Sequence, residues 1–317
     1  MTTATAEPRT RRARKNKKSV PPAMRRTRGE KVYNVVNIIL LSVFAFICTY
    51  PFYYLIINSL SNNSLSAAGD VNWWIQGFHL ENYKTVLGLD GLAQAAWISV
   101  ARTVIGTVLT VLASAYLGFM FTQQKMWHRS FWYRFVVITM YFNAGLIPMF
   151  ITMKNLGLTN NFWVYILPAI VQPFNIILVK TYIESIPASL QEAAEVDGAG
   201  TFTVFWRIVL PMCTPILATV AIFSAVNQWN SFQDTLIYMT DSKLYSLQYL
   251  LYTYINQASS IANSVKAGGS VTALASTATP TAIRMTVSVI VVLPIMFIYP
   301  FFQRFFVKGM MLGAVKG

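Results

Sequence analysis

Long runs of apolar residues without a single charge divide this chain into segments of membrane length. A helix needs about 20 residues to cross the hydrocarbon core of a bilayer. The windows free of Asp, Glu, Lys and Arg are 32–69, 103–124, 135–153, 155–179, 208–233, 244–265 and 285–303. The window 244–265 is rich in Ser, Gln, Asn and Tyr, so we interpret it as a loop. The other windows predict six transmembrane helices, at 35–59, 97–121, 132–153, 162–182, 209–228 and 283–305.

The composition supports an all-α integral membrane protein. Of 317 residues, 55% are hydrophobic and 11% are charged, whereas a soluble domain carries about 25% charged residues. Some basic residues fall inside the predicted helices, each within about two turns of an end, where a long side chain reaches the interface. These residues are Arg102, Arg134, Lys180, Arg284 and Arg304.

The distribution of Lys and Arg predicts the orientation of the chain. Residues 1–31 hold eleven basic residues against two acids. Because cytoplasmic segments carry the excess of Lys and Arg, we expect both termini in the cytoplasm. We interpret residues 1–32 as a basic tail that contacts membrane lipid rather than nucleic acid. A six-helix domain at 33–308 and a cytoplasmic tail at 309–317 follow.

The loops 60–96 and 229–282 then face the outside. The first contains the aromatic stretch "NWWIQGFHLENY", which is typical of an aromatic belt at the membrane interface. In the second, "LYSLQYLLYTYI" predicts an interfacial helix, and the small, polar residues after it predict a flexible loop around 257–281. Loops of this length are uncommon without a role.

A short acidic stretch, "SLQEAAEVDGAG" at 189–200, lies in the predicted cytoplasmic loop 183–207. Ser189 followed by Glu192 fits a capping box that starts a helix. Gly198 and Gly200 then end this helix and permit a reversal. We expect Thr201 or Thr203 to cap the next helix. A capped surface helix without a partner is the simplest interpretation of the pattern alone.

The spacing of this stretch resembles the signature loop of permease subunits in binding-protein-dependent ABC importers. Glu192-Ala193-Ala194 is followed after three residues by Gly198, and after nine more by Ile208, then Leu210-Pro211. The stretches "NAGLIPMF" (143–150), "QWNSF" (228–232) and "KGMMLGAVKG" (308–317) also resemble the carbohydrate branch, the maltose-type and oligosaccharide permeases. The similarity covers roughly residues 33–317 and implies the type I importer permease fold.

The resemblance implies that the acidic helix docks into an ATPase subunit, with Glu192 paired to a basic residue there. The implied coupling residues are Glu192, Ala193, Ala194, Asp197, Gly198, Gly200, Ile208, Leu210 and Pro211. Glu195 has no assigned role. The C-terminal tail of maltose-type relatives also reaches the ATPases, which implies contacts by Gly309, Gly313, Lys316 and Gly317. The loop around 257–281 corresponds to one that reaches into the binding protein.

The implied partners are a second, different permease chain, two ATPase subunits and an extracytoplasmic solute-binding protein in the bacterial inner membrane. The chain lacks the G-x-x-x-x-G-K-[ST] motif, so ATP and Mg are expected on the ATPases and no cofactor on this chain. No Cys/His spacing of a metal site and no catalytic set occurs. An ion-coupled secondary transporter is the main alternative, but such proteins usually place acids or His within spans, and the predicted spans hold none.

Amide and aromatic side chains near the membrane are candidates for contact with an oligosaccharide. Sugar hydroxyls need amide partners, and the apolar faces of sugars stack on rings. The candidates are Tyr141, Asn143, Gln172, Asn175, Asn227, Gln228, Trp229 and Asn230. Hydrogen bonding between helices is the alternative role for each.

Overall fold

The computed structural model describes the backbone of residues 27–266 and 279–314, and all regular structure there is helical. The chain divides at Pro51 into two units, residues 1–51 and 52–317. The described part of the first unit belongs to α1 (Arg28–Leu60), whose apolar side chains up to Phe46 and Ile47 are exposed. Exposed apolar surface along a long helix is typical of contact with lipid or with another chain.

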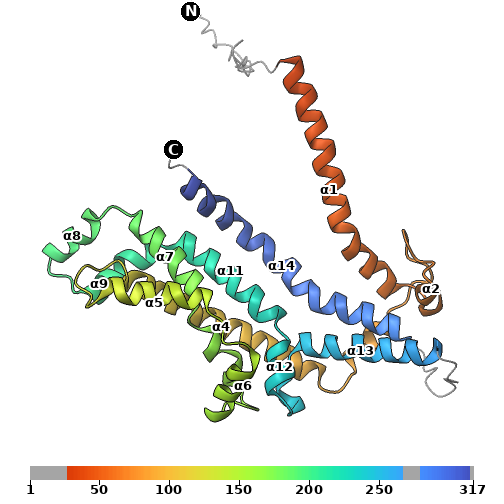
Figure 1. The fold of residues 1–317 in the computed structure, drawn as a ribbon. Helices are drawn as coiled ribbons and strands as arrows, with labels where there is room; N and C mark the ends of the chain where they lie inside the picture. Colours follow the sequence, from red (N-terminus) through yellow and green to blue (C-terminus); the bar gives the residue numbers. More distant parts are fainter. Residues whose placement is uncertain (1–26, 267–278, 315–317) are drawn as a thin grey trace, which may run out of the picture. The chain divides into compact units, whose positions relative to one another are not determined.

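The second unit is a bundle of helices of unequal length (Figure 1). The helices after α1 are α2 (Asn63–Ala68), α3 (Glu81–Leu87), α4 (Leu92–Met120), α5 (Arg129–Tyr141), α6 (Leu146–Asn155), η2 (Phe162–Tyr165), η3 (Leu167–Ala169), α7 (Pro173–Glu184), α8 (Ser189–Val196), α9 (Thr201–Val204), η4 (Phe205–Val209, a π-helix), α10 (Leu210–Met212), α11 (Thr214–Asn230), α12 (Gln233–Tyr238), η5 (Ser242–Leu244), α13 (Leu247–Lys266) and α14 (Pro280–Ala314). Within this unit, α8 and α9 lie at one end and α13 lies toward the other.

Three of the predicted membrane helices are broken. Within the described residues, α1 and α4 are each long and apolar enough to cross a membrane alone. The predictions of single helices at 132–153, 162–182 and 209–228 are wrong, because these regions are bent by 118°, 45° and 79° respectively. If each bent pair is one span, the described helices give up to five crossings, besides the shorter apolar stretch 281–297 of α14.

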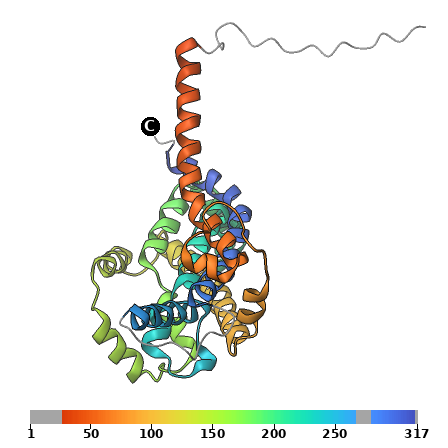
Figure 2. The same ribbon diagram turned by 90° about the vertical axis from the view of Figure 1, so that its right-hand side faces the viewer.

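Prolines account for these breaks. Pro148 lies in the first turn of α6, and a helix running through residues 142–145 would bring its ring against the carbonyl of Ala144. The side chain of Asn143 instead accepts a hydrogen bond from the Gly145 amide at 2.9 Å, which turns the chain. Figure 2 shows this bend between the yellow-green helices α5 and α6. Pro173 and Pro215 likewise stand at the starts of α7 and α11.

The loops predicted at 60–96 and 229–282 contain helices. Helix α4 begins at Leu92, five residues before the predicted 97, and α2 and α3 precede it. The prediction of a flexible loop from 257 is wrong as far as Lys266, because α13 continues to that residue. Leu247, Leu251, Tyr254 and Ile261 keep helical spacing through the polar stretch. Residues 267–278, the rest of the predicted loop, lie outside the described residues.

Helix α4 is the centre of the packing in the second unit. It contacts α7, α11 and α13, and it contributes Ala115 and Phe119 to a buried cluster with residues of α7, α9, η4 and α11. The crossing with α7 is close at Gly118, where an added Cβ would lie 2.9 Å from the Val179 side chain. Small residues at such crossings let helix backbones approach, which favours packing in a membrane.

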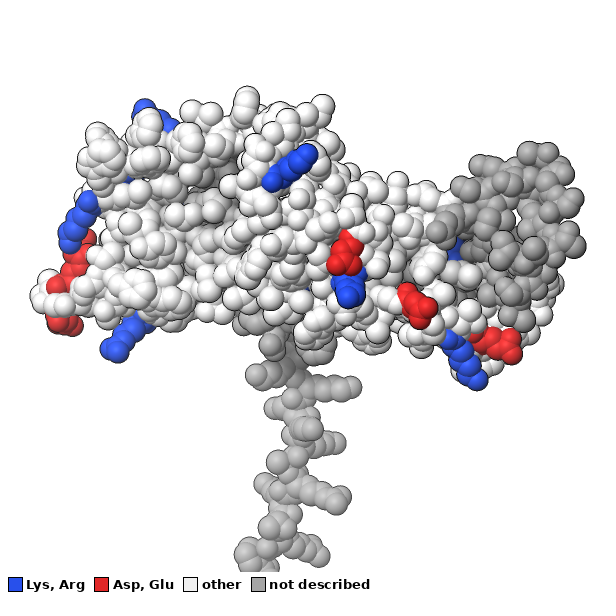
Figure 3. All heavy atoms as spheres, turned by 90° about the horizontal axis from the view of Figure 1, so that it is seen from below, with Lys and Arg blue, Asp and Glu red and all other residues white. Residues whose placement is uncertain are grey.

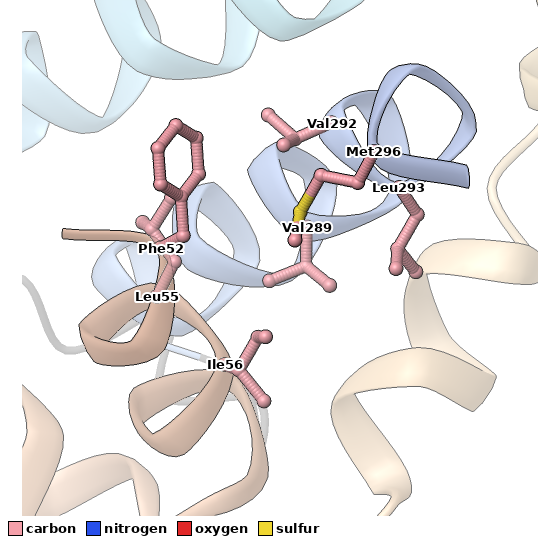
Figure 4. A pocket seen from close by; sticks show the side chains of 7 residues that line it. All are labelled: Phe52, Leu55, Ile56, Val289, Val292, Leu293 and Met296. Carbon is pink, nitrogen blue, oxygen red and sulfur yellow. The ribbon is translucent and has the colours of Figure 1, made fainter. Parts of the chain in front are cut away.

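A small apolar crevice marks the contact between the last turns of α1 and helix α14. Phe52, Leu55 and Ile56 face Val289 and Val292 across it, and its other lining residues, Leu293 and Met296, are also apolar (Figure 4). All the lining residues belong to the second unit, and they interact through dispersion forces.

Candidate functional site

Helix α8 carries the acidic stretch and begins differently from the predicted capping box. Ser189 is the first helical residue, and the preceding Ala188 makes no side-chain cap hydrogen bond. Ala188 already has helical backbone angles, and its carbonyl accepts from the amide of Glu192 at 3.0 Å. The helix therefore starts from the turn at Pro187, whose fixed φ is preorganised for a first helical position.

Gly198 ends α8, as predicted. Its φ is +82°, a conformation that costs other L-residues about 1–2 kcal/mol. The amide of Ala199 donates to the Ala194 carbonyl at 2.9 Å and that of Gly198 to the Glu195 carbonyl at 3.0 Å. These two bonds form a Schellman motif, which satisfies the last carbonyls of the helix.

Part of the signature on α8 is exposed. Glu192 and Ala193 are exposed, and Val196 is 86% exposed, whereas Ala194 packs against a buried cluster. Glu192 forms no ion pair within the described parts of the chain. A charge, a small residue and an exposed apolar side chain on one short helix make a surface that another protein can approach closely.

The side of α8 that carries Gln191 and Glu195 is braced against the turn between α4 and α5. Lys125 Nζ lies 2.7 Å from Glu195 Oε2, and Gln123 donates to the side chain of Gln191 at 3.3 Å. A cavity of about 360 Å³ lies between this turn and α8. Glu195, which had no assigned role, therefore holds the helix to its support. The pair is solvent-exposed, so it contributes about 0.2–1 kcal/mol.

The rest of the signature continues into α9, η4 and α10. The expectation of a threonine cap is wrong, because Gly200 is the N-cap of α9 and no side chain caps it. Ile208 lies in the π-helical turn η4, and Leu210 and Pro211 begin α10. Asp197 follows α8 directly and is exposed.

The C-terminal candidates are divided by the limits of the structure. Gly309 and Gly313 belong to α14, whereas Lys316 and Gly317 lie outside the described residues.

A groove of about 360 Å³ brings together half of the eight candidates for substrate contact. It lies where α7 and α11 meet, beside η3. The candidates that line it are Gln172, Asn175, Asn227 and Gln228. Ala169, Phe174, Phe223 and Ser224 complete the lining. The groove thus offers amides and two aromatic rings and no charged group.

The side-chain amides of the groove differ in whether they already make hydrogen bonds within the protein. The side chain of Asn175, 6% exposed, makes no hydrogen bond to another described residue, and neither does the exposed side chain of Asn227. Gln172 donates to the Ala169 carbonyl at 3.3 Å. Asn175 and Asn227 are therefore available to a polar ligand.

The other four candidates do not line this groove. Tyr141 is exposed at the end of α5, and Asn143 turns the chain at the bend before α6. Trp229 donates its indole N–H to the Val291 carbonyl at 3.1 Å, and Asn230 bonds to Val226 and Gln248.

Sequence reasoning missed the most buried charge of the site. Arg102, expected to reach the interface, is 1% exposed and pairs with Asp234 of α12. Its guanidinium also donates to the Gln228 side chain at 3.0 Å and lies 4.2 Å from the centre of the Tyr165 ring. We call Arg102, Tyr165, Gln228, Ser231 and Asp234 the buried arginine cluster. No local pattern reveals a partner 132 residues away.

Asp234 also affects the pKa of Tyr238, the last residue of its own helix. Burial raises the pKa of the Tyr238 hydroxyl, and the negative charge of Asp234 raises it further. The phenol therefore stays neutral well above physiological pH.

The face of the molecule in Figure 3 is mainly uncharged, with large white areas that separate small groups of charged side chains. Among the described residues, no group of His, Cys, Asp and Glu is arranged to hold a metal ion.

Comparisons with known proteins agree with this architecture. The family model described as "Binding-protein-dependent transport system inner membrane component" matches residues 106–312. Protein LplC of Bacillus subtilis is 33% identical over 93% of this chain and 98% of its own length. The polygalacturonan/rhamnogalacturonan transport system permease protein YtcP of the same organism is 33% identical over 87% of this chain and 96% of its own.

A solved structure extends the likeness to three dimensions. A chain from a bacterial ABC transporter involved in the import of the acidic polysaccharide alginate matches with a TM-score of 0.75 and 27% identity. The match covers 89% of this chain and 99% of that one. A second alginate transporter structure, in complex with an alginate pentasaccharide-bound periplasmic protein, matches at 12% identity with a TM-score of 0.52, which shows the fold alone.

Family model, relatives and solved fold agree over most of the chain, and the helical bundle has the type I ABC permease fold. The chain therefore belongs to the family of binding-protein-dependent transport system inner membrane components.

Proposed function

We propose that this chain is one permease subunit of an ATP-driven importer for an oligosaccharide. With a second, different permease chain it forms the translocation path, and an extracytoplasmic binding protein delivers the sugar. The relatives support this substrate class, since their names include transport of polygalacturonan and of arabinooligosaccharides. Two ATPase subunits supply ATP hydrolysis and hold the ATP and Mg.

The observation that carries the proposal is the form of α8. It is short, held at one side by Lys125 and Gln123, ended by a Schellman motif, and exposed at Glu192, Ala193 and Val196. A braced helix transmits a push without deforming, whereas a loose loop absorbs it. In the proposal, α8 docks on the ATPase, and closure of the ATPases rocks the spans between inward- and outward-facing states.

The orientation completes the proposal. Six spans with both termini in the cytoplasm place α8 inside and α12 and α13 outside. The basic residues 1–32 lie against anionic lipid of the bacterial inner membrane, and residues 309–317 contribute to the ATPase interface. The groove with Asn175 and Asn227 belongs to the sugar path, since free amides match sugar hydroxyls and Phe174 and Phe223 match apolar sugar faces.

Purification of the complex from native bacterial membranes tests the assignment as a whole. We expect a second permease, an ATPase and an extracytoplasmic binding protein to copurify with this chain, the last carrying an oligosaccharide detectable by mass spectrometry. A binding protein that carries a non-sugar ligand would contradict the substrate class, and purification without an ATPase would contradict the mechanism.

The two glycines after α8 give a matched test of its shape. Gly198 has φ +82° and Gly200 has φ −69°, and an added Cβ meets no atom within 4 Å at either. Gly198→Glu should therefore strain the turn by about 1–2 kcal/mol and abolish uptake in whole cells, while Gly200→Glu changes uptake little. Membrane insertion, followed by immunoblotting, should be normal for both. Normal uptake by Gly198→Glu would disprove the role of the turn.

Substitution of the two glutamates of α8 tests separately whether this helix docks on the ATPase and whether it is braced by Lys125. Glu192→Lys should remove the ATPase from the purified complex, because it reverses the charge on the docking face. Glu195→Lys should weaken uptake modestly, and the added change Lys125→Glu should restore it, because the exposed pair with Lys125 re-forms in reverse. Copurified ATPase is measured by quantitative gel. Retention of the ATPase by Glu192→Lys would rule out the docking face.

The groove is tested by removing its free amides. Asn175→Ala and Asn227→Ala should each lower the rate of sugar uptake by about tenfold, as the loss of about 1.4 kcal/mol of interaction predicts. Asn230→Ala is the control, because its amide bonds to Val226 and Gln248 and does not line the groove. Radiolabelled sugar uptake is the measurement, and equal rates for all three variants would exclude the groove from the path.

A further inference from the structure

The buried arginine cluster satisfies every donor of its guanidinium. Arg102 Nε and Nη2 donate to Gln228 Oε1 at 3.2 and 3.0 Å, Nη1 donates to Asp234 Oδ1 at 3.1 Å and to the Ser231 carbonyl at 3.4 Å, and Nη2 also donates to Asp234 Oδ2. An arginine has five N–H donors in a fixed fork, and all five are used. Such a site is specific for arginine, because a lysine offers a point charge without the fork.

The cluster joins segments that are distant in sequence. Arg102 belongs to α4, Tyr165 to η2, Gln228 to α11, and Asp234 to α12. Neighbouring bonds extend it to the start of α13. The Tyr165 hydroxyl donates to the Leu244 carbonyl at 2.7 Å, and Thr235, the residue after Asp234, donates to Ser246 at 3.0 Å. The cluster thus holds α12 and the start of α13 to α4 and α11.

One member of the cluster is also part of the groove wall. Gln228 lines the groove, yet its side chain is held at both ends. Its Oε1 accepts from Arg102, and its Nε2 donates to the Tyr165 carbonyl at 3.1 Å. Gly106, one turn after Arg102 on α4, leaves the space for it, since an added Cβ would lie 2.7 Å from Nε2. Arg102 therefore fixes the position of the Gln228 side chain in the groove wall.

We propose that Arg102 is a positioning residue for transport: it holds Gln228 in the groove wall and fastens that wall to α12 and α13. This inference rests on the proposed function, in which α12 and α13 face the binding protein. Docking of the binding protein on the outside then moves the groove wall through the buried arginine cluster. The side chain of Asp234 is 20% exposed, so the cluster reaches the surface of the described structure at α12.

The charge pair is costly to break, so the decisive variant removes both charges. A single Arg102→Met leaves Asp234 unpaired, and such losses destabilise proteins by several kcal/mol, whereas replacing a whole buried pair by apolar residues is often neutral. The double variant Arg102→Met/Asp234→Leu removes the five hydrogen bonds and leaves no unpaired charge. Arg102→Lys keeps the pair with Asp234 and loses the bonds to Gln228 and Ser231.

The test uses the complete importer in proteoliposomes, with the copurified binding protein loaded with its sugar. For the double variant we expect wild-type ATPase activity without binding protein. The maximal stimulation by the binding protein and the sugar uptake should both fall by about tenfold, as the loss of about 1.4 kcal/mol of coupling predicts. The half-saturating concentration of binding protein should be unchanged, because the docking surface is intact. Arg102→Lys should recover part of the stimulation.

A second comparison asks whether Arg102 acts through Gln228. Adding Gln228→Ala to the double variant should lower uptake no further than the double variant alone, since residues in one network are not additive. Additive losses would overturn the proposal. So would wild-type stimulation in the double variant, a parallel fall of basal and stimulated ATPase activity, or loss of the assembled complex, each of which leaves the cluster a role in folding only. If the wild-type importer is not stimulated by its binding protein, the proposed function itself fails.

Discussion

The close approach of other helices to α4 is the constraint on which the second unit depends. Within a bilayer, lipid is as apolar as leucine, so burial of apolar surface contributes little free energy to the association of helices. Contact must come from tight packing and from hydrogen bonds between helices. Helix α4 provides both, since Gly118 lets the backbone of α7 approach, and Gly106 admits Gln228 of α11 beside Arg102. The groove and the support of α8 are both built from helices that this packing holds in place.

The bent helices are also constrained by the need to satisfy backbone hydrogen bonds. A proline leaves a carbonyl without its partner, which lipid cannot replace. The breaks before α6, α7 and α11 therefore need protein around them. One of these breaks, the break before α7, serves the groove: α7 starts at Pro173, beside Phe174 and Asn175, and η3, on the other side of the break, contributes Ala169. Irregular backbone and ligand-accessible amides occur together because each needs a cavity within the protein.

The hydrophobic pattern predicted the long apolar helices α1 and α4, and the spacing of the signature predicted the short helix α8, because both depend on local sequence. Gly198 was predictable as the helix end for the same reason, since only glycine adopts that φ cheaply. The breaks were not predictable, because prolines inside a helix and prolines at a break look alike in sequence. Half of the residues that line the groove were predicted from their residue type. Phe223 and Ser224 lie four residues before Asn227 and Gln228, so helical periodicity could have added them to the prediction. Arg102 was misjudged, since its partners come from segments that meet only in three dimensions.

The separation of Arg102 from Asp234 also has a consequence for how the protein is made. Asp234 follows Arg102 by 132 residues. At a synthesis rate of about 5–20 residues per second, Asp234 is therefore added roughly 7–26 s after Arg102. During that time α4 carries an uncompensated charge, which costs up to about 2.5–3.5 kcal/mol at the centre of a membrane helix and less toward its end. Arg102 is residue 11 of the 29 residues of α4, so this cost lies between that of the helix centre and that of its end. The pair can form only after α12 has emerged from the ribosome, so a chain truncated before that helix keeps an unpaired Arg102.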